Sequence, residues 1–282
     1  MAVPIPPGDR RLDGWPRLAL HGEAGDDDPV DYDTRMHAVY EVGRALPEHA
    51  IANWISVFAR FAPQDRPLTV LDLGSGAGRF SAALAGEFGG PVHAVEPSAK
   101  MREAAMARHA HPAVTVTAGA AERIPLPDSS CDLALLFLSW HHVADPERGA
   151  AELARVVRPG GTVLLRTAFG DRLPDVGYHR FFPEARDIEQ RVLPTLAATR
   201  APFAQAGFDE VILERLTLHR VEPMTDWANR LRQRAISTFE HLTAEQTAAG
   251  FARLDAEVAA NPGQVEVSEG ADLLVLRRRN AP

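Results

Sequence analysis

The sequence predicts a doubly wound α/β fold with a mostly parallel, seven-stranded sheet. First, short apolar runs alternate with amphipathic segments, the order expected of a sheet that helices cover on both faces. Second, a turn with three alternate glycines at 74–78 separates the apolar run 68–73 from an amphipathic segment. Third, an acid, Glu96, ends the next apolar run, 22 residues after Gly74. In such folds ligands bind at the carboxyl ends of the strands, where these residues should meet.

Each element is expected from its own pattern. Strands are expected at 68–73, 91–95, 114–117, 132–138, 162–167, 210–220 and 271–276. Helices are expected at 47–61, 80–88, 99–108, 146–157 and 193–206, with two further helical patterns at 227–242 and 243–260. Three helix starts are marked in the sequence. Ser98 and Asp145 are suited to N-cap positions, and Thr243 with Gln246 has the spacing of a capping box.

Composition limits the class of protein. The chain has 282 residues, of which 45% are hydrophobic, and its net charge of −8 argues against a broad nucleic-acid surface. Its one cysteine, Cys131, excludes a disulfide framework within the chain and a cysteine-cluster zinc site. No apolar run approaches the roughly 20 residues that cross a bilayer, and the N-terminus lacks an apolar signal core. We expect a cytoplasmic enzyme, a monomer or homodimer, that binds neither nucleic acid nor membrane.

The glycine turn distinguishes two classes of ligand. A dinucleotide turn reads G-x-G-x-x-G and directs amides and a helix dipole at a pyrophosphate, but Arg79 stands where its third glycine would be. Asp72, two residues before the first glycine, would repel a pyrophosphate and suits a cationic ammonium or sulfonium group. Glu96 has the spacing of an acid that accepts ribose hydroxyls, which either class of ligand carries.

The order of the motifs resembles that of the class I S-adenosylmethionine-dependent methyltransferases, in particular the branch that includes the quinone-biosynthesis methyltransferases. The resemblance covers roughly residues 40–167. Its motifs are Val70–Phe80, Gly119–Asp128, His141-His142-Val143, Asp145-Pro146-Glu147 and Arg158-Pro159-Gly160-Gly161. It implies a Rossmann-like methyltransferase fold and S-adenosylmethionine as the cofactor. Magnesium-dependent methyltransferases would be expected to have acids after the fourth strand, where this chain has Ser139-Trp140-His141-His142, so we expect no metal. The cofactor-binding residues that it implies are Tyr40, Arg44, Asp72, Gly74, Ser75, Gly76, Gly78, Phe80, Glu96, Pro97, Ser98, Met101, Ala120, Ala121, Glu122 and Leu138.

Two parts of this resemblance carry particular expectations. Ala120 replaces the family's aspartate that accepts from the adenine amino group, so backbone groups of Ala120 and Ala121 would have to serve instead. Tyr40 and Arg44 resemble an entry segment that closes over the methionine end of the cofactor. A surface helix turn with a packed Tyr40 is the alternative for that segment.

The transferable methyl group should point towards the histidines that follow the fourth strand. The resemblance implies in-line displacement by an O, N or C nucleophile of a small molecule, which needs a base only if the acceptor loses a proton. Of His141 and His142 we favour His142 as that base, and helix capping or packing is the alternative role. The candidate substrate residues Tyr178, His179, Phe182, Trp227 and Arg230 suit a planar or acidic acceptor, although such an aromatic stripe also fits a plain core.

We expect a mobile N-terminal arm, 1–30, and a single domain, 31–282. Cap elements are expected at about 31–62, 171–192 and 224–262. Two other functions stay open from sequence. A non-catalytic protein that binds the cofactor would carry the same motifs, whereas an NAD-dependent oxidoreductase would need a third glycine at position 79 and a hydride-transfer pair such as tyrosine and lysine.

Overall fold

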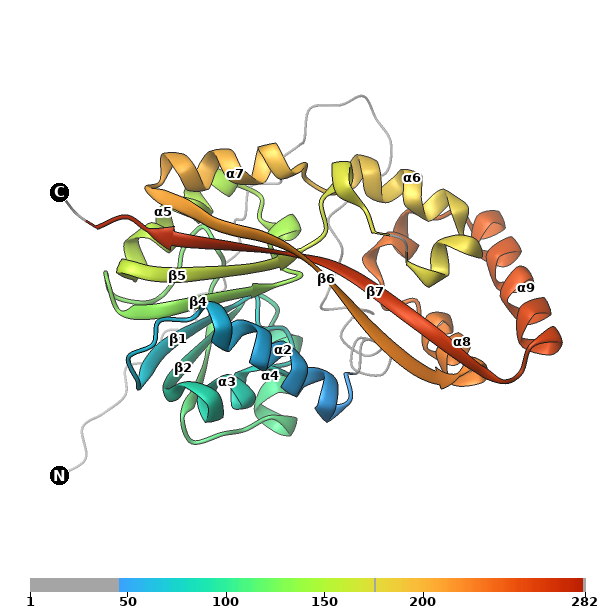
Figure 1. The fold of residues 1–282 in the computed structure, drawn as a ribbon, viewed down its shortest axis with the longest axis horizontal. Helices are drawn as coiled ribbons and strands as arrows, with labels where there is room; N and C mark the ends of the chain where they lie inside the picture. Colours follow the sequence, from blue (N-terminus) through green and yellow to red (C-terminus); the bar gives the residue numbers. More distant parts are fainter. Residues whose placement is uncertain (1–45, 175, 281–282) are drawn as a thin grey trace, which may run out of the picture.

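The computed structural model describes residues 46–174 and 176–280, and its centre is one seven-stranded sheet (Figure 1). The strands are β1 (Leu68–Leu73), β2 (Gly89–Glu96), β3 (Val114–Ala118), β4 (Cys131–Phe137), β5 (Val157–Thr167), β6 (Phe208–Pro223) and β7 (Gln264–Arg278). Their order is β3-β2-β1-β4-β5-β7-β6, with β7 antiparallel to both of its neighbours. The pairs from β3 to β5 are parallel, which confirms the doubly wound, mostly parallel fold.

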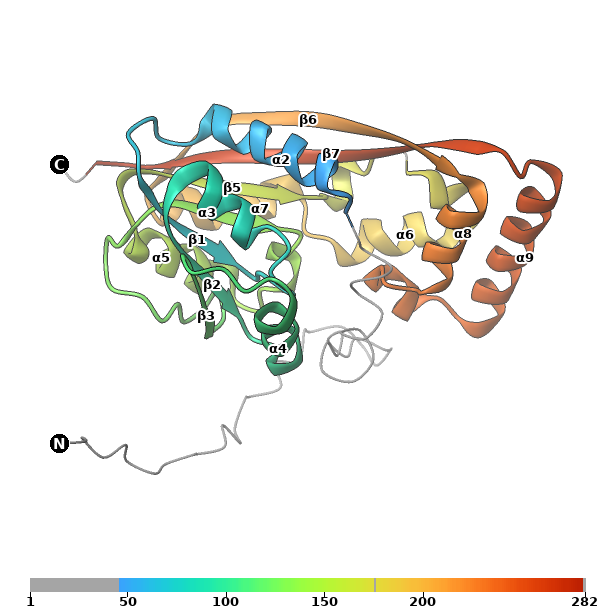
Figure 2. The ribbon, with the colours of Figure 1, turned by 90° about the horizontal axis from the view of Figure 1, so that it is seen from below.

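Helices cover both faces of this sheet, and a separate group of helices stands beyond its end (Figure 2). The helices are α2 (Glu48–Phe61), α3 (Ser81–Phe88), α4 (Ala99–Arg108), α5 (Pro146–Val156), α6 (Pro183–Val192), α7 (Leu196–Gln205), α8 (Met224–Arg232) and α9 (Ala244–Ala260). Short 3-10 turns lie at η2 (Trp140–His142), η3 (Gly170–Arg172), η4 (Gly177–Arg180) and η5 (Ser237–His241). The expected arm 1–30 lies outside the described residues, and so do the predicted cofactor residues Tyr40 and Arg44.

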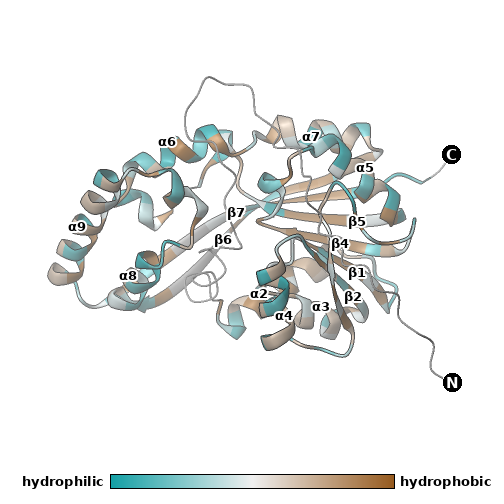
Figure 3. Cartoon of the chain, turned by 180° about the vertical axis from the view of Figure 1, so that it is seen from behind, coloured by the Kyte–Doolittle hydropathy of each residue, from teal (hydrophilic) through white to brown (hydrophobic). Residues whose placement is uncertain are grey.

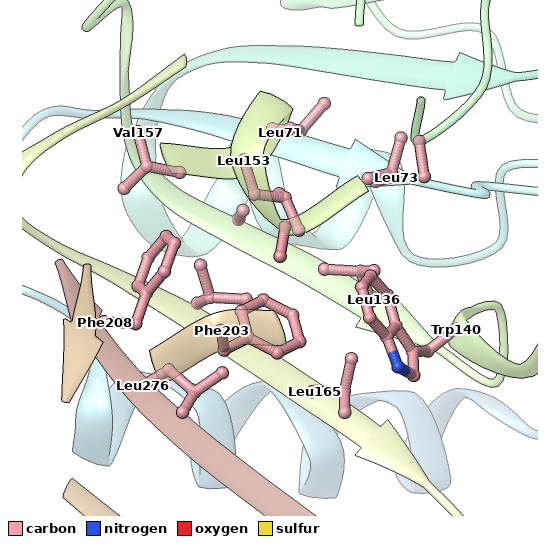
Figure 4. Packing of buried hydrophobic residues seen from close by; sticks show 14 of the residues in the cluster. Leu71, Leu73, Leu136, Trp140, Leu153, Val157, Leu165, Phe203, Phe208 and Leu276 are labelled. Atoms are coloured by element: carbon pink, nitrogen blue, oxygen red, sulfur yellow. The ribbon is translucent and has the colours of Figure 1, made fainter. Parts of the chain in front are cut away.

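Successive side chains of a strand point to opposite faces of the sheet, so the fold has two hydrophobic cores, one on each face. On β4, Leu133 and Leu135 pack with α2 and α3, while Ala134 and Leu136 join the cluster beneath α5 and α7. Figure 4 shows the second cluster, in which Phe203 of α7 packs with Trp140, their ring centroids 4.7 Å apart. The central strands β1, β4 and β5 are correspondingly largely hydrophobic (Figure 3). Because both faces are buried, the strands appear in the sequence as continuous apolar runs.

The predicted helix starts are confirmed. The side chains of Ser98 and Asp145 accept hydrogen bonds from the amides of Met101 and Arg148, and the capping box at the start of α9 is complete. The single helix expected over 227–242 is wrong. Helix α8 ends at Arg232, and Arg234 adopts φ +53° before the chain continues as η5. A left-handed residue ends an α-helix, whatever the apolar spacing on either side.

Strands β6 and β7 extend well beyond the other five strands of the sheet, and the outer helices lie beside this extension (Figures 1 and 2). Strand β5 ends at Thr167, which pairs with Asp272, whereas residues 264–271 pair only with 216–223 of β6. The predicted strands 210–220 and 271–276 are therefore too short. Elements η4, α6, α8, η5 and α9 share a third core, built around Phe182, Phe239 and Leu254. We call these five elements the cap, which lies beyond the carboxyl ends of the parallel strands.

Candidate active site

The glycine turn after β1 adopts the backbone that its sequence predicts. Gly74, Gly76 and Gly78 all have positive φ, at +69°, +56° and +81°. Such values are accessible to glycine without the steric cost that an L side chain would meet. The amide of Gly74 donates to the carbonyl of Val95, which fixes the turn to the end of β2. The turn therefore presents backbone groups at the edge where β1 and β2 end.

Gly74 also has no room for a side chain. A Cβ atom there would lie 2.4 Å from Cβ of Ser139, the residue whose hydroxyl donates to the Leu73 carbonyl. We expect Gly74→Ala to lower the free energy of unfolding by about 2–4 kcal/mol, since strain at positive φ adds to overpacking. Urea unfolding measures this change. Gly86→Ala in α3, where a new Cβ meets nothing within 4 Å, is the control and should be neutral or slightly stabilising. Equal effects at the two positions would contradict the close approach.

Glu96 binds the glycine turn to the start of α4. Its carboxylate accepts from the Gly76 amide and from the Ser98 amide, each at 2.9 Å, and the residue is only 7% exposed. A carboxylate offers about four acceptor positions, so two amide contacts do not exhaust it. Glu96 thus organises the turn, a role that the spacing argument did not reveal.

Asp72 is buried at the end of β1, where it is 3% exposed and accepts a 2.7 Å hydrogen bond from the Ser81 hydroxyl. Burial raises the pKa of Asp72 to about 6, although the Ser81 hydrogen bond and the charge of Arg79 act in the opposite direction. A cation bound beside this carboxylate would favour its charged form. The acid is therefore suited to a positively charged ligand, as the sequence predicts.

Because its pKa is raised in the folded protein, Asp72 makes the free energy of unfolding depend on pH. Between pH 3.8 and about 6 the folded state holds the Asp72 proton more tightly than the unfolded state, so this contribution to stability falls as pH rises through the window. Asp72→Asn removes the ionisation and keeps an acceptor for Ser81. We expect the variant to exceed wild type by up to about 3 kcal/mol above pH 6 and to lose the advantage near pH 4. Urea unfolding of both proteins across this range tests it, and a pH-independent difference would contradict the assignment.

The segment after β3 is held mainly by α5. Arg155 donates to the carbonyls of Ile124 and Leu126 and to Glu152, which in turn accepts from the Ile124 amide. The Glu122 carboxylate accepts from the amides of residues 144 and 145 and so turns towards the start of α5. Of the predicted residues here, Ala121 is buried in the core beneath α5, and Ala120 forms a bridge with Arg123. The backbone of this segment is thus fixed independently of an acid at position 120.

The other predicted cofactor residues within 46–174 lie on the elements that follow β1, β2 and β4. Phe80 and Met101 are buried, Ser98 caps α4, and Pro97 lies between Glu96 and that cap. Leu138 leaves β4 with φ +57°, an uncommon value for a residue with a side chain. Strained backbone of this kind concentrates at functional sites.

A cavity of about 190 Å³ lies between the carboxyl ends of β4 and β5 and the cap. From the sheet side it is lined by Leu46, Trp54, Arg79, Phe137, Leu138, His141, Arg166 and Ala168. From the outer part of the fold it is lined by Tyr178, Glu189, Trp227, Arg230, Leu231, Ile236, Thr238, Val267 and their neighbours. Its aromatic rings and few charged groups resemble the lining of sites that bind small organic molecules.

The two histidines after β4 face different surroundings. His141 is half-buried and lines the cavity, whereas His142 is exposed. Their ring centroids are 4.0 Å apart. As the candidate base we therefore favour His141 over the predicted His142, because η2 turns Trp140 into the core and directs the next side chain into the cavity wall.

The candidate substrate residues separate into two groups. Tyr178, Trp227 and Arg230 line the cavity. Phe182 does not, because its ring is buried in the cap core against Phe239 and Phe251. His179 is not among the lining residues either. Its ring nitrogen lies 3.1 Å from the carboxylate of Glu189, and Glu189 does line the cavity.

Arg166, Glu189 and Thr238 line the cavity but were not predicted. Arg166 gives one signal in the sequence, a charged residue within the apolar run 162–167. The other two lie in stretches where nothing distinguishes them from surface residues.

The described residues contain neither a candidate metal site nor a candidate membrane-spanning helix. No group of three or more His, Cys, Asp or Glu side chains within 46–174 and 176–280 is arranged to hold a metal ion. Across the same part of the chain, none of the helices combines the length and apolar character that crossing a bilayer requires.

Part of the chain is similar to proteins described as methyltransferases. Residues 71–165 match the family model described as a methyltransferase domain. An uncharacterized methyltransferase of Mycobacterium tuberculosis is 42% identical over 127 residues, which are 45% of this chain and 47% of that protein. The malonyl-acyl-carrier-protein O-methyltransferase of Serratia marcescens is 32% identical over 157 residues, which cover 55% and 59% of the two chains. The chain thus spans about half the length of the curated relatives it matches.

A solved structure supports the fold over a larger share of the chain. A protein from an antibiotic biosynthesis pathway of Anabaena variabilis, assigned as a methyltransferase, superposes with a TM-score of 0.60 at 24% identity. The match covers 79% of this chain and 96% of that one.

Proposed function

We propose that the chain carries a class I S-adenosylmethionine-dependent methyltransferase domain and that it transfers a methyl group to a small molecule bound in the cavity. The observation that carries this proposal is the position of the cavity. It adjoins Leu138 and His141 at the end of β4, the strand next to β1 with its glycine turn. An acceptor in the cavity and a cofactor at the turn would therefore be neighbours.

The residues at the turn fit S-adenosylmethionine. The hydroxyl oxygen of Ser75 is buried without a hydrogen-bond partner among the described residues, although buried polar atoms are nearly always paired. Asp72 suits the positively charged part of the molecule, and Glu96 suits its ribose. The bound cofactor would supply an electrophilic methyl group on a sulfonium. Arg79 interrupts the dinucleotide pattern and favours this cofactor over NAD.

The protein's own part in the reaction is mainly to position the acceptor. In-line displacement needs the nucleophilic atom held about 3–3.5 Å from the methyl carbon in a site from which water is excluded. Trp54, Phe137, Tyr178 and Trp227 give the cavity flat apolar walls. His141 lies where it could take a proton from an acceptor hydroxyl or amine. A planar acceptor with a polar or ionised group fits this lining.

Transfer of label tests the proposal. The full chain is incubated with S-adenosylmethionine labelled in its methyl group and with a panel of hydroxy, amino and carboxylic aromatic compounds. We expect label in at least one acceptor, with loss of activity in Trp227→Ala. Binding of S-adenosylhomocysteine without label in any acceptor would favour a non-catalytic cofactor-binding protein. Binding of NAD instead would favour an oxidoreductase.

A further inference from the structure

The cap side of the cavity is bounded by the indole ring of Trp227. This residue lines the cavity but is only 6% exposed, because most of its ring packs in the core of the cap. Its ring centroid lies 5.7 Å from that of Phe181, with 59° between the two ring planes. The cap core therefore backs the indole, and the cavity is the open side towards which the ring could move.

Helix α8, which carries Trp227, is fixed at both ends. At its start the amide of Met224 donates to the carbonyl of Gly263, at 2.9 Å. Near its end Arg230 donates to both carboxylate oxygens of Glu222, a residue of β6. Such a bidentate pair fixes orientation as well as distance. The indole is thus held in place by the backbone that carries it as well as by its neighbours.

Gly177, the first residue of η4, lies against the edge of this indole and also lines the cavity. A Cβ atom at Gly177 would lie 3.1 Å from Cζ2 and 3.5 Å from Cη2 of Trp227. The first distance is shorter than the roughly 3.5–4.0 Å at which two carbon atoms pack best. Gly177 is not among the glycines with positive φ, so its backbone conformation would suit an L residue. The position of the indole, and not the turn, is what requires a glycine here.

The space that remains is close to that of one ring. The cavity has a volume of about 190 Å³. An apolar cavity of about 150 Å³ in a protein core can bind benzene. A six-membered ring with small substituents therefore fits, whereas a second fused ring needs more volume. On the sheet side the wall includes Trp54 and Phe137, whose rings pack edge to face with centroids 5.2 Å apart. Extra room on the cap side requires displacement of Trp227.

We propose that Trp227, seated against Gly177, limits the methyl acceptor to a single-ring aromatic molecule; this inference rests on the proposed function. Trp227 determines the size of the acceptor through the volume of its indole. Gly177 determines where that indole lies. A two-ring acceptor would have to displace a side chain that the cap core and α8 both hold, and such overpacking weakens binding.

The test compares probes that differ by one fused ring. Calorimetry measures the binding of phenol and 2-naphthol, and of 4-hydroxybenzoate and 6-hydroxy-2-naphthoate, to the full chain saturated with S-adenosylhomocysteine. In at least one pair we expect the single-ring probe to bind roughly tenfold or more tightly than the two-ring probe. Trp227→Ala should reverse this preference, because removal of the indole opens space that the second ring fills. Trp227→Phe should shift the preference in the same direction by a smaller factor, and it serves if circular dichroism shows that Trp227→Ala is not folded.

Gly177→Ala tests the contact between the two residues. Alone, it should weaken binding of the single-ring probe by roughly 3- to 10-fold, because the new methyl group moves the indole towards the cavity. In the Trp227→Ala protein the same substitution should change binding by less than about twofold, since the ring that it would meet is gone. Gly263→Ala, where a new Cβ meets nothing within 4 Å, is the matched control and should change neither affinity nor preference.

The outcomes distinguish this inference from the function on which it rests. If S-adenosylhomocysteine does not bind the wild-type chain, the proposed function fails. If it binds, three results would overturn the inference alone. In the first, no single-ring probe binds more tightly than its two-ring partner. In the second, the folded Trp227 variants keep the preference of wild type. In the third, Gly177→Ala has the same effect with and without the indole.

Discussion

His141→Ala should lower kcat by about 10²- to 10⁴-fold on an acceptor that must lose a proton, with little change in affinity for S-adenosylhomocysteine. Imidazole is a common proton acceptor in enzymes, and the His141 side chain lines the cavity at the end of β4, beside Leu138. Removing it would leave the acceptor and cofactor in place but without a base. Steady-state kinetics with the acceptor identified by labelling measures the change.

The adjacent histidine gives a matched control for this prediction. His142 is exposed, so His142→Ala should retain nearly full activity and melt within a degree or two of wild type. Loss of activity in His142→Ala with a mild effect in His141→Ala would restore the choice made from sequence. Small effects in both variants would mean that the acceptor reacts in an already ionised or electron-rich form.

Glu96→Ala should weaken S-adenosylhomocysteine binding by about 10- to 150-fold, which corresponds to about 1.5–3 kcal/mol. The substitution removes the proposed acceptor for the ribose hydroxyls. It also leaves the amides of Gly76 and Ser98 without the carboxylate that accepts from both, so the turn itself should loosen. Calorimetric titration gives the affinity, and urea unfolding gives the accompanying loss of stability, which we expect to be about 1–3 kcal/mol.

Two comparisons isolate the contribution of the ribose. Glu103→Ala in α4 removes an exposed acid paired with Lys100 and should leave binding unchanged. Wild type should bind the 2′-deoxyadenosyl analogue more weakly than the natural nucleoside, whereas Glu96→Ala should bind the two alike. Equal binding of both by wild type would limit Glu96 to its structural role.

The fold was largely predictable because its signals are local. Ser98, Asp145 and Thr243 cap their helices within three residues, so each helix start can be identified without knowing the tertiary structure. The lengths of β6 and β7 could not be identified in this way. Their outer halves pair only with each other, and the pairing of 216–223 with 264–271 depends on residues far apart in the chain.

The site was predictable on the cofactor side and much less so on the acceptor side. Asp72 and the glycines belong to one contiguous motif. The Glu189 carboxylate, in contrast, is held by hydrogen bonds from the hydroxyls of Tyr178 and Thr238, which lie in other elements. Phe182 shows the converse error, since an aromatic residue beside cavity-lining neighbours is buried in the cap core instead. Sequence spacing does not tell which side of a short 3-10 turn faces a cavity.

Binding of S-adenosylmethionine at the glycine turn is the central requirement of the proposed function. Calorimetric titration of the full chain with S-adenosylhomocysteine tests it, using Gly76→Val as the partner variant, since a β-branched side chain at φ +56° would distort the turn. We predict saturable binding at one site per wild-type chain, none detectable in a folded Gly76→Val protein, and no binding of NAD to either. Equal binding by Gly76→Val and wild type, or binding of NAD in place of the adenosyl compound, would contradict the account.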